Sequence, residues 1–344
     1  MSRKRTKHSP DLDHAINRRR FLGVAAGTTA AALAGVGAAA TPAAAADTWT
    51  VPRGRLGIQL YTLRDKVSTI GFAPVFEALA DYGYNEIEFA GYTQGSAGAI
   101  TLAQLKQLVS DAGMEGIGSH VGYSSTNPAA YTFATQLEKV LDDAQFLGLP
   151  HIGTASSPFR YGTTVDAVKR AAAEFNVYGA AAKARGMKFY QHNHGDEFRF
   201  ASDDPTVRLY DVLLSETDPD LVYLEMDIYW AYTGQYRFSV RPDGVAAPFD
   251  PLDYVLAQPD RYPLFHVKDG EEDTAVRDGY HMVDVGDGDI DYARFIGALT
   301  SLPTRRYHHW QVERDDAVSP TANPAGSFST ASRSADYLRA LRMT

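Results

Sequence analysis

Four residues able to bind a divalent metal each close an apolar or aromatic, strand-like run in the second half of the chain. They are His192, Asp227, His266 and Glu313. The carboxyl ends of the strands in a parallel barrel all meet on one face, so we expect these four side chains to converge there. Imidazole and carboxylate donors suit an ion such as Mn²⁺, Zn²⁺, Co²⁺ or Mg²⁺. The pattern therefore predicts a metal site and metal-assisted chemistry.

Eight such runs alternate with longer stretches of helical period, which is the pattern of repeated βα units. The runs predict strands at residues 56–61, 86–90, 114–120, 151–155, 187–192, 221–227, 262–268 and 307–313. Helices are expected at residues 72–82, 101–112, 131–147, 163–185, 205–215, 250–258, 291–301 and 328–342. We therefore predict an α/β fold, a single (β/α)8 TIM barrel at residues 47–344, with long loops at 232–248 and 269–288.

The first 46 residues have the composition of a targeting segment. Asn17-Arg18-Arg19-Arg20-Phe21-Leu22 precedes a weakly apolar Ala/Gly run that ends in Ala44-Ala45-Ala46. This order is typical of a twin-arginine signal peptide with a small-residue cleavage site. We expect the twin-arginine export machinery to carry the protein to the cell envelope or the extracellular space, with no stable membrane association once the signal is cleaved.

Charge and cysteine content narrow the function further. The whole chain has a net charge of −9, and seven basic against two acidic residues in the first 46 leave −14 for the remainder. So acidic a surface disfavours nucleic acid as a partner. The chain has no cysteine, so a metal site here uses no thiolate and the exported fold uses no disulfide.

From Gly57 to Asp315 the chain resembles the sugar isomerase/epimerase superfamily with the xylose-isomerase-like barrel. The motifs that carry the resemblance include Gly83-Tyr84-Asn85-Glu86-Ile87-Glu88, Ser119-His120-Val121, His192-Asn193-His194, Glu225-Met226-Asp227-Ile228-Tyr229-Trp230, His266-Val267-Lys268-Asp269 and Gln311-Val312-Glu313. In that family the metal is typically held by Glu, Asp, His and Glu on strands five to eight. Asp227, His266 and Glu313 are similar to the last three, whereas His192 stands where the family has Glu.

The resemblance and the chemistry of the residues together imply a sugar bound through adjacent oxygens, with proton abstraction next to a carbonyl. Glu313 is expected to hold metal and to take part in the transfer, and Lys268 to stabilise the developing enolate oxygen. His120 and His194 are candidate proton carriers, and Glu88 is a further candidate base. The expected substrate contacts are Tyr61, Trp230, Glu225 and Asn193.

Three functions remain open on the sequence. The first is a metal-dependent isomerase or epimerase acting on an unphosphorylated sugar or keto-sugar, since phosphorylated sugars are mainly cytoplasmic. The second is a lyase or hydratase that acts on a 3-keto-glycoside through the same enolate, and His192 in place of Glu favours it. The third is a sugar-binding barrel without catalytic activity. In each case the partner is a small carbohydrate.

Overall fold

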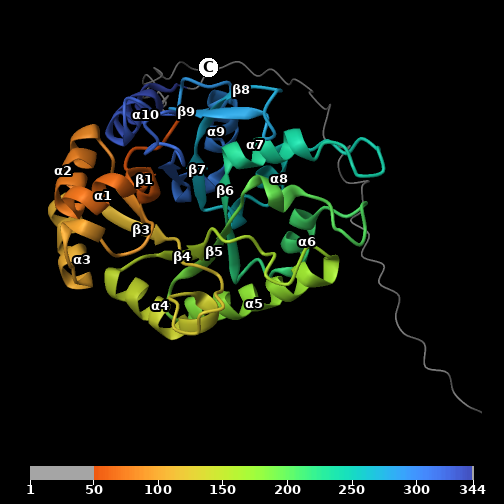
Figure 1. Cartoon of the computed structure of the whole chain (residues 1–344), viewed down its shortest axis with the longest axis horizontal. Coiled ribbons are helices and arrows are strands. Elements are labelled where there is room, and N and C mark those ends of the chain that lie inside the picture. Colours follow the sequence, from red (N-terminus) through yellow and green to blue (C-terminus); the bar gives the residue numbers. More distant parts are fainter. Residues whose placement is uncertain (1–49, 343–344) are drawn as a thin grey trace, which may run out of the picture. The chain divides into compact units, whose positions relative to one another are not determined.

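The computed structural model describes residues 50–342, which form a barrel of parallel strands surrounded by helices (Figure 1). The predicted export signal and its cleavage site lie outside the described residues. The barrel strands are β1 Leu56–Gln59, β2 Glu86–Phe89, β3 Glu115–Ser119, β4 His151–Thr154, β5 Lys188–His192, β6 Val222–Asp227, β7 Leu264–Val267 and β10 His309–Val312. Each lies within a run predicted to be a strand.

The eight strands form one sheet in the order β3-β2-β1-β10-β7-β6-β5-β4, and every pairing in it is parallel. The two edge strands, β3 and β4, are joined by a parallel bridge between His120 and Gly153. The Val121 N–H also donates to the Gly153 carbonyl at 2.8 Å. These contacts nearly close the sheet, and the α/β TIM-barrel prediction is confirmed.

Helices pack around the outside of the strands, as Figure 1 shows. They are α1 Arg64–Ile70, α2 Phe72–Tyr82, α3 Leu102–Asp111, α4 Phe133–Leu147, α5 Val165–Ala184, α6 Leu209–Glu216, α7 Ile228–Arg237, α8 Pro251–Ala257, α9 Tyr292–Thr300 and α10 Ser327–Ala340. Local chemistry sets their ends. Thr101 and Gln104 form a reciprocal capping box at the start of α3, and Gly148 ends α4 with a left-handed φ of 82°.

Both segments that we predicted to be long loops contain regular structure. Helix α7 begins directly after β6, because the Asp227 side chain accepts the backbone N–H of Trp230 and caps the helix. Residues after β7 form an antiparallel hairpin of β8 Asp269–Glu272 and β9 Tyr280–Val283. Helix α1 was not predicted either. These elements lie at the carboxyl-end face of the barrel, where they shape the entrance.

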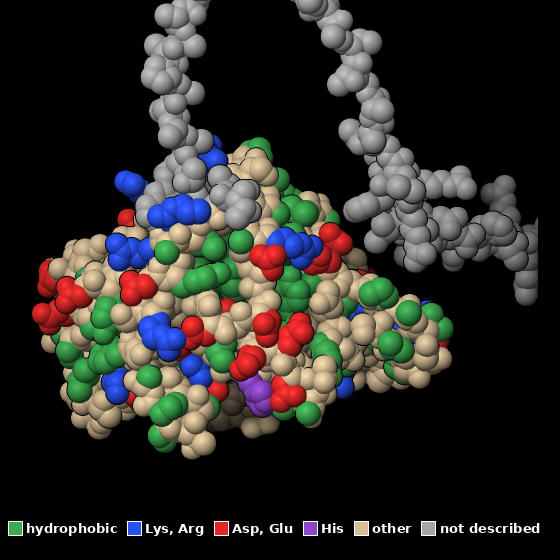
Figure 2. Space-filling view, turned by 90° about the horizontal axis from the view of Figure 1, so that it is seen from above, with side chains coloured by type: hydrophobic (Ala, Val, Ile, Leu, Met, Phe, Trp, Pro, Cys, Tyr) green, Lys and Arg blue, Asp and Glu red, His purple; other side chains and the backbone are tan. Residues whose placement is uncertain are grey.

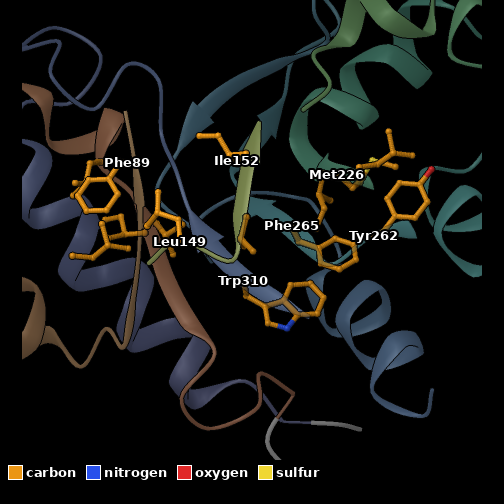
Figure 3. Packing of buried hydrophobic residues seen from close by; sticks show 14 of the residues in the cluster. Phe89, Leu149, Ile152, Met226, Tyr262, Phe265 and Trp310 are labelled. Carbon is orange, nitrogen blue, oxygen red and sulfur yellow. The ribbon is translucent and has the colours of Figure 1, made fainter. Parts of the chain in front are cut away.

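The main apolar core lies between the strands and the helices. Figure 3 shows part of it, with Phe265 and Trp310 from neighbouring strands stacked at a ring-centroid distance of 4.5 Å. Both side chains are almost fully buried, and each such burial contributes roughly 1.5–3 kcal/mol. Within residues 50–342, none of the helices has the length and apolar character needed to span a bilayer.

Surface charges are mixed on the face drawn in Figure 2, where Lys and Arg side chains alternate with Asp and Glu and form no continuous basic area. The two ends of the described chain meet at the opposite side of the barrel from the strand carboxyl ends. The Thr50 N–H donates to the Leu341 carbonyl at 3.3 Å, beside the starts of β1 and β2.

Candidate functional site

The four predicted metal ligands come together at the carboxyl ends of the strands. His192 and Asp227 are the last residues of β5 and β6, His266 lies in β7, and Glu313 follows β10 directly. One ligand atom from each lies within 4.8 Å of all the others, and all four side chains are buried. The barrel therefore brings together four side chains that are far apart in the sequence.

The closest contacts within this group are between donors that suit a cation. His192 Nε2 lies 3.0 Å from His266 Nδ1 and 3.1 Å from Asp227 Oδ2. His266 Nδ1 lies 2.7 Å from Glu313 Oε2. Two ring nitrogens facing each other beside two carboxylates match the donor chemistry of a divalent ion such as Zn²⁺ or Mn²⁺. The residues present thus fit the expected metal.

The protonation states of three of the four candidate ligands suit metal binding, which requires neutral imidazole and ionised carboxylate. The exception is His266: burial would lower its pKa, but Glu225, Glu313 and Glu88 outweigh burial and hold the pKa well above its usual value, so a bound metal would have to replace one of its protons. Burial, together with the charge of His266, holds the pKa of His192 well below its usual value, so this ring stays neutral. Burial would raise the pKa of Asp227, but Lys268 together with His192 and His266 outweighs burial, and the pKa lies well below normal. The pKa of Glu313 is lowered for the same reason.

Lys268 places its ammonium group among three carboxylates. Its Nζ lies 2.7 Å from Glu313, 2.8 Å from Asp227 and 2.9 Å from Asp315. Burial would lower the pKa of Lys268, but these carboxylates outweigh burial and hold the pKa well above its usual value. Lys268 is therefore a fixed positive charge at the floor of the site.

A second layer of polar side chains lies deeper in the barrel, behind His266. His266 Nε2 is 2.6 Å from Glu88 Oε2 and 3.2 Å from Glu225 Oε1. His120 Nε2 is 2.8 Å from Glu225 and 3.2 Å from Glu88. Burial would lower the pKa of His120, but Glu88 and Glu225 raise it to about 10. These two carboxylates and two imidazoles form a second group of potential metal donors.

Tyr190 of β5 completes this inner layer, since its hydroxyl donates to Glu88. Two glycines, Gly153 of β4 and Gly118 of β3, make room for it. A Cβ at Gly153 would lie 2.3 Å from the Tyr190 carbonyl oxygen, and one at Gly118 would lie 3.1 Å from the Tyr190 hydroxyl. The barrel interior is therefore built around a polar network as well as an apolar core.

A pocket of about 400 Å³ opens above the metal-ligand candidates. Its lining includes His192, Lys268 and Glu313, together with several other predicted site residues and three that we did not predict. The other predicted residues in the lining are Tyr61, His120, His194 and Trp230, and the three that we did not predict are Ala90, Ala155 and Asp315. Pockets of this size are typical of small-molecule sites. Seven of the twelve predicted site residues thus line one open cavity.

Five of the predicted residues do not line this pocket: the metal-ligand candidates Asp227 and His266, and also Glu88, Glu225 and Asn193. Glu88 and Glu225 are fully buried in the inner layer, so a molecule in the pocket cannot touch them directly. Asn193 is also buried. Its side-chain amide exchanges two 3.1 Å hydrogen bonds with the Asp227 backbone and so ties β5 to β6. Direct roles for Glu88 as a base, and for Glu225 and Asn193 as substrate contacts, do not agree with these positions.

Asp315 is a pocket residue that the sequence analysis missed. It accepts hydrogen bonds from Lys268 Nζ at 2.9 Å and from Trp230 Nε1 at 3.1 Å. Burial raises the pKa of Asp315, although the Lys268 ammonium opposes the shift. The residue follows Glu313 at the alternate position that shares a strand face, and this spacing was the available signal.

A larger hollow, about 540 Å³, lies at the opposite end of the barrel. It is lined by Lys106, Arg55 and His309 among others, but Arg55 and His309 are already paired with Glu86. Its lining contains no group of potential metal donors comparable with the one at the strand carboxyl ends. In TIM barrels the carboxyl-end face carries the chemistry, so the smaller cavity is the candidate site.

Fold and site together define a parallel (β/α)8 barrel with a buried group of imidazoles and carboxylates at its mouth. The model of the xylose isomerase-like TIM barrel family matches residues 76–327, and the chain belongs to that family. A search of curated proteins found no match.

Solved structures of sugar isomerases and epimerases share this fold. A sugar phosphate isomerase/epimerase from Parabacteroides distasonis aligns with a TM-score of 0.64 and 23% identity over 85% of this chain and 96% of its own. An L-ribulose 3-epimerase aligns with a TM-score of 0.56 and 16% identity, over 83% of this chain and 93% of its own. The IolI protein with a bound zinc atom aligns with a TM-score of 0.58 and 13% identity, over 83% of this chain and 96% of its own.

Proposed function

We propose that this protein is a metal-dependent isomerase or epimerase that removes a proton next to the carbonyl of an unphosphorylated sugar or keto-sugar. One observation carries the proposal. His192, Asp227, His266 and Glu313 offer two ring nitrogens and two carboxylate oxygens within 4.8 Å of one another beside an open pocket. Family membership and the fold shared with sugar isomerases and epimerases support the same class of reaction.

The metal would supply a positive charge that polarises the substrate carbonyl and acidifies the neighbouring C–H bond. The side chains would do the remaining work. Glu313 lies at the pocket wall and is the proposed base for the proton. Lys268, fixed beside it at 2.7 Å, would stabilise negative charge on the substrate oxygen. His120 and His194 face the same pocket and could return a proton from its other side.

The charges around the pocket favour an unphosphorylated substrate. Lys268 is the only Lys or Arg among the described residues that line it, and three carboxylates already accept from its ammonium group. A phosphate group would find no free cation there and would face Asp315 and Glu313. This agrees with the proposed export of the protein, which would place it away from the main pool of phosphorylated sugars.

Two aromatic side chains provide apolar surface for a sugar ring. The Tyr61 side chain is 43% exposed, and Trp230 is held in place by its hydrogen bond to Asp315. Both line the pocket, so we propose that they contact the substrate.

Elimination from a 3-keto-glycoside is the second candidate, and the distribution of acids and bases in the pocket favours it. Both pocket carboxylates, Glu313 and Asp315, follow β10, whereas the imidazoles of His120, His192 and His194 come from other strands. Glu313 would take the C–H proton, and an imidazolium would give a proton to the departing oxygen. Two carboxylates on opposite sides of the pocket, which could act as two opposed catalytic bases, are not present among the described pocket residues.

Solvent exchange tests the proposal and separates the two reactions. Protein loaded with Mn²⁺, Zn²⁺ or Co²⁺ is incubated in D₂O with unphosphorylated ketoses and with 3-keto-glycosides, and NMR follows deuterium at the carbon next to the carbonyl. Isomerisation or epimerisation gives an isomer of the substrate that carries deuterium and has lost no group, whereas elimination releases the aglycone. Binding of sugar without exchange, with every metal, would overturn both and leave a sugar-binding barrel.

A further inference from the structure

His266 faces two different groups of residues with its two ring nitrogens. Nδ1 lies toward the pocket, 2.7 Å from Glu313 and 3.0 Å from His192. Nε2 lies toward the barrel interior, 2.6 Å from Glu88. The side chain is fully buried, so its orientation is set by these neighbours rather than by solvent.

The inner contacts imply which nitrogen carries the hydrogen. A ring that binds metal through Nδ1 keeps one hydrogen, on Nε2, and the separation of 2.6 Å between Nε2 and Glu88 Oε2 is that of a strong hydrogen bond. Glu225 Oε1 lies 3.2 Å from the same nitrogen and accepts no hydrogen bond, as expected if the single hydrogen goes to Glu88. When a metal replaces the Nδ1 hydrogen, Nδ1 would offer its lone pair on the side of Glu313 and His192.

Glu88 is itself held firmly. The Tyr190 hydroxyl donates to its other oxygen, and His120 lies 3.2 Å from that oxygen. The carboxylate therefore has partners on both oxygens and no contact with the pocket. An acceptor fixed in this way can hold a ring in one tautomer and one orientation.

We propose that Glu88 is a positioning residue for the metal site: it accepts the Nε2–H of His266 and so presents the Nδ1 lone pair to the metal. The inference rests on the proposed metal site and adds a residue that acts through His266 without touching substrate. Loss of such an outer partner typically weakens metal binding 10- to 100-fold.

The geometry argues against a second metal ion in the inner layer. An ion bound by Glu88, His120, Glu225 and His266 would need a lone pair on His266 Nε2 while Nδ1 serves the outer site, so the ring would have to lose both hydrogens. The 2.6 Å contact and the Tyr190 hydroxyl instead give Glu88 two hydrogen-bond donors. The inner layer therefore supports the outer site.

The test is a comparison of metal affinity between Glu88→Gln and Glu86→Gln, using competition titrations with Zn²⁺ and Co²⁺. Both residues are buried carboxylates of β2, but Glu86 pairs with Arg55 and His309 at the other end of the barrel. We expect Glu88→Gln to weaken binding about 10- to 100-fold and Glu86→Gln to leave it unchanged. Glu225→Gln should have a smaller effect than Glu88→Gln, since Glu225 receives no hydrogen from His266.

A second measurement needs no variant. In the zinc-loaded native protein, long-range ¹H–¹⁵N NMR correlations should show a hydrogen on His266 Nε2 and a metal-bound Nδ1. Equal affinities of Glu88→Gln and native protein, or two zinc ions per chain with no hydrogen on Nε2, would overturn the positioning role. Failure of the native protein to bind any metal would instead overturn the proposed metal site, so the two failures are distinguishable.

Discussion

At the scale of single residues, the site is organised around charge. Five carboxylates, those of Glu88, Glu225, Asp227, Glu313 and Asp315, lie in or beside the pocket, and all but the partly exposed Asp315 are buried. Burying such groups without partners is costly, and each has a cationic or hydrogen-donating neighbour. The balance of these charges leads to two predictions.

Asp227→Asn should abolish high-affinity metal binding while the fold is kept. Asparagine caps a helix as well as aspartate does, so α7 should still begin at this position. The lost charge removes one ligand, and since outer partners alone cost 10- to 100-fold, we expect affinity to fall by at least about 100-fold. Calorimetric titration with Zn²⁺ measures it. The exposed Asp220→Asn serves as control, and retained affinity in Asp227→Asn would exclude Asp227 as a ligand.

Lys268→Met should destabilise the metal-free protein by about 3–5 kcal/mol, because it leaves Asp227, Glu313 and Asp315 without their shared cation. Added Zn²⁺ should recover much of this loss, since a bound ion compensates two of the three charges. Urea unfolding with and without metal measures both effects. Lys188→Met, at the start of β5 and far from the pocket, should change stability by less than about 1 kcal/mol. Unchanged stability of Lys268→Met without metal would contradict the expectation.

At the scale of elements, the hairpin β8–β9 and the loop that follows depend on Asp269. Its carboxylate accepts four backbone N–H groups, from Gly270, Gly286, Gly288 and Ile290. This one side chain therefore anchors the segment that follows Lys268 and fixes its path beside the barrel mouth.

Asp269→Asn should loosen this segment, because an amide nitrogen cannot accept the N–H groups that one carboxylate oxygen now binds. Hydrogen bonds to a charged acceptor contribute about 1.5–3 kcal/mol, so we expect a loss of roughly 2 kcal/mol and faster proteolysis at residues 273–289. Unfolding curves and limited proteolysis measure the two. The control is Asp287→Asn in the same loop, whose exposed ion pair with Arg333 should matter little. Equal behaviour of both variants would rule out the anchoring role.

The barrel strands could be predicted because β-branched and aromatic runs alternate with helical stretches, and their bounds agree to within two residues at either end. Helix α7 could not be separated from a loop, since it begins without a break at Asp227 and its aromatic residues show no clear apolar stripe. The sequence of Asp269–Glu272 is too polar to be recognised as a strand. These residues form one only because they pair with Tyr280–Val283.

The site could be predicted in part for a similar reason. Alternation along a strand indicates which residues share a face, so it correctly grouped Glu225 with Asp227. This alternation does not indicate how deep in the barrel a side chain lies. Glu225, two residues earlier on β6, lies one layer below the pocket, and Glu88 lies at the same inner level. Only the register between strands, which depends on distant parts of the chain, separates the two layers.

At the scale of the whole molecule, buried histidines outside the site link stability to pH. His308 is buried against Phe265 and Trp310, and neither of its ring nitrogens has a hydrogen-bond partner among the described residues. Burial and the neighbouring His309 lower the pKa of His308 to about 4. The unfolded chain takes up a proton below about pH 6.5, whereas the folded chain does not until about pH 4. His308 therefore lowers the free energy of unfolding as pH falls through this range.

His308→Phe should remove this loss, so that between pH 6.5 and 4 the free energy of unfolding falls by up to about 3 kcal/mol less than in the native protein. Denaturant unfolding at several pH values measures the slope. His281→Phe removes an exposed imidazole and should leave the slope as it is. Identical pH slopes in native protein and His308→Phe would show that His308 does not contribute.

The bond between Thr50 and Leu341 has a practical consequence for handling the protein. Because both residues lie beside the starts of β1 and β2, a linker to a solid support attached at either point leaves the pocket facing solution. The same closeness makes circular permutation feasible: a short peptide can bridge these two positions, and new termini can be opened at the exposed turn around Asp243 and Gly244 without cutting a barrel strand.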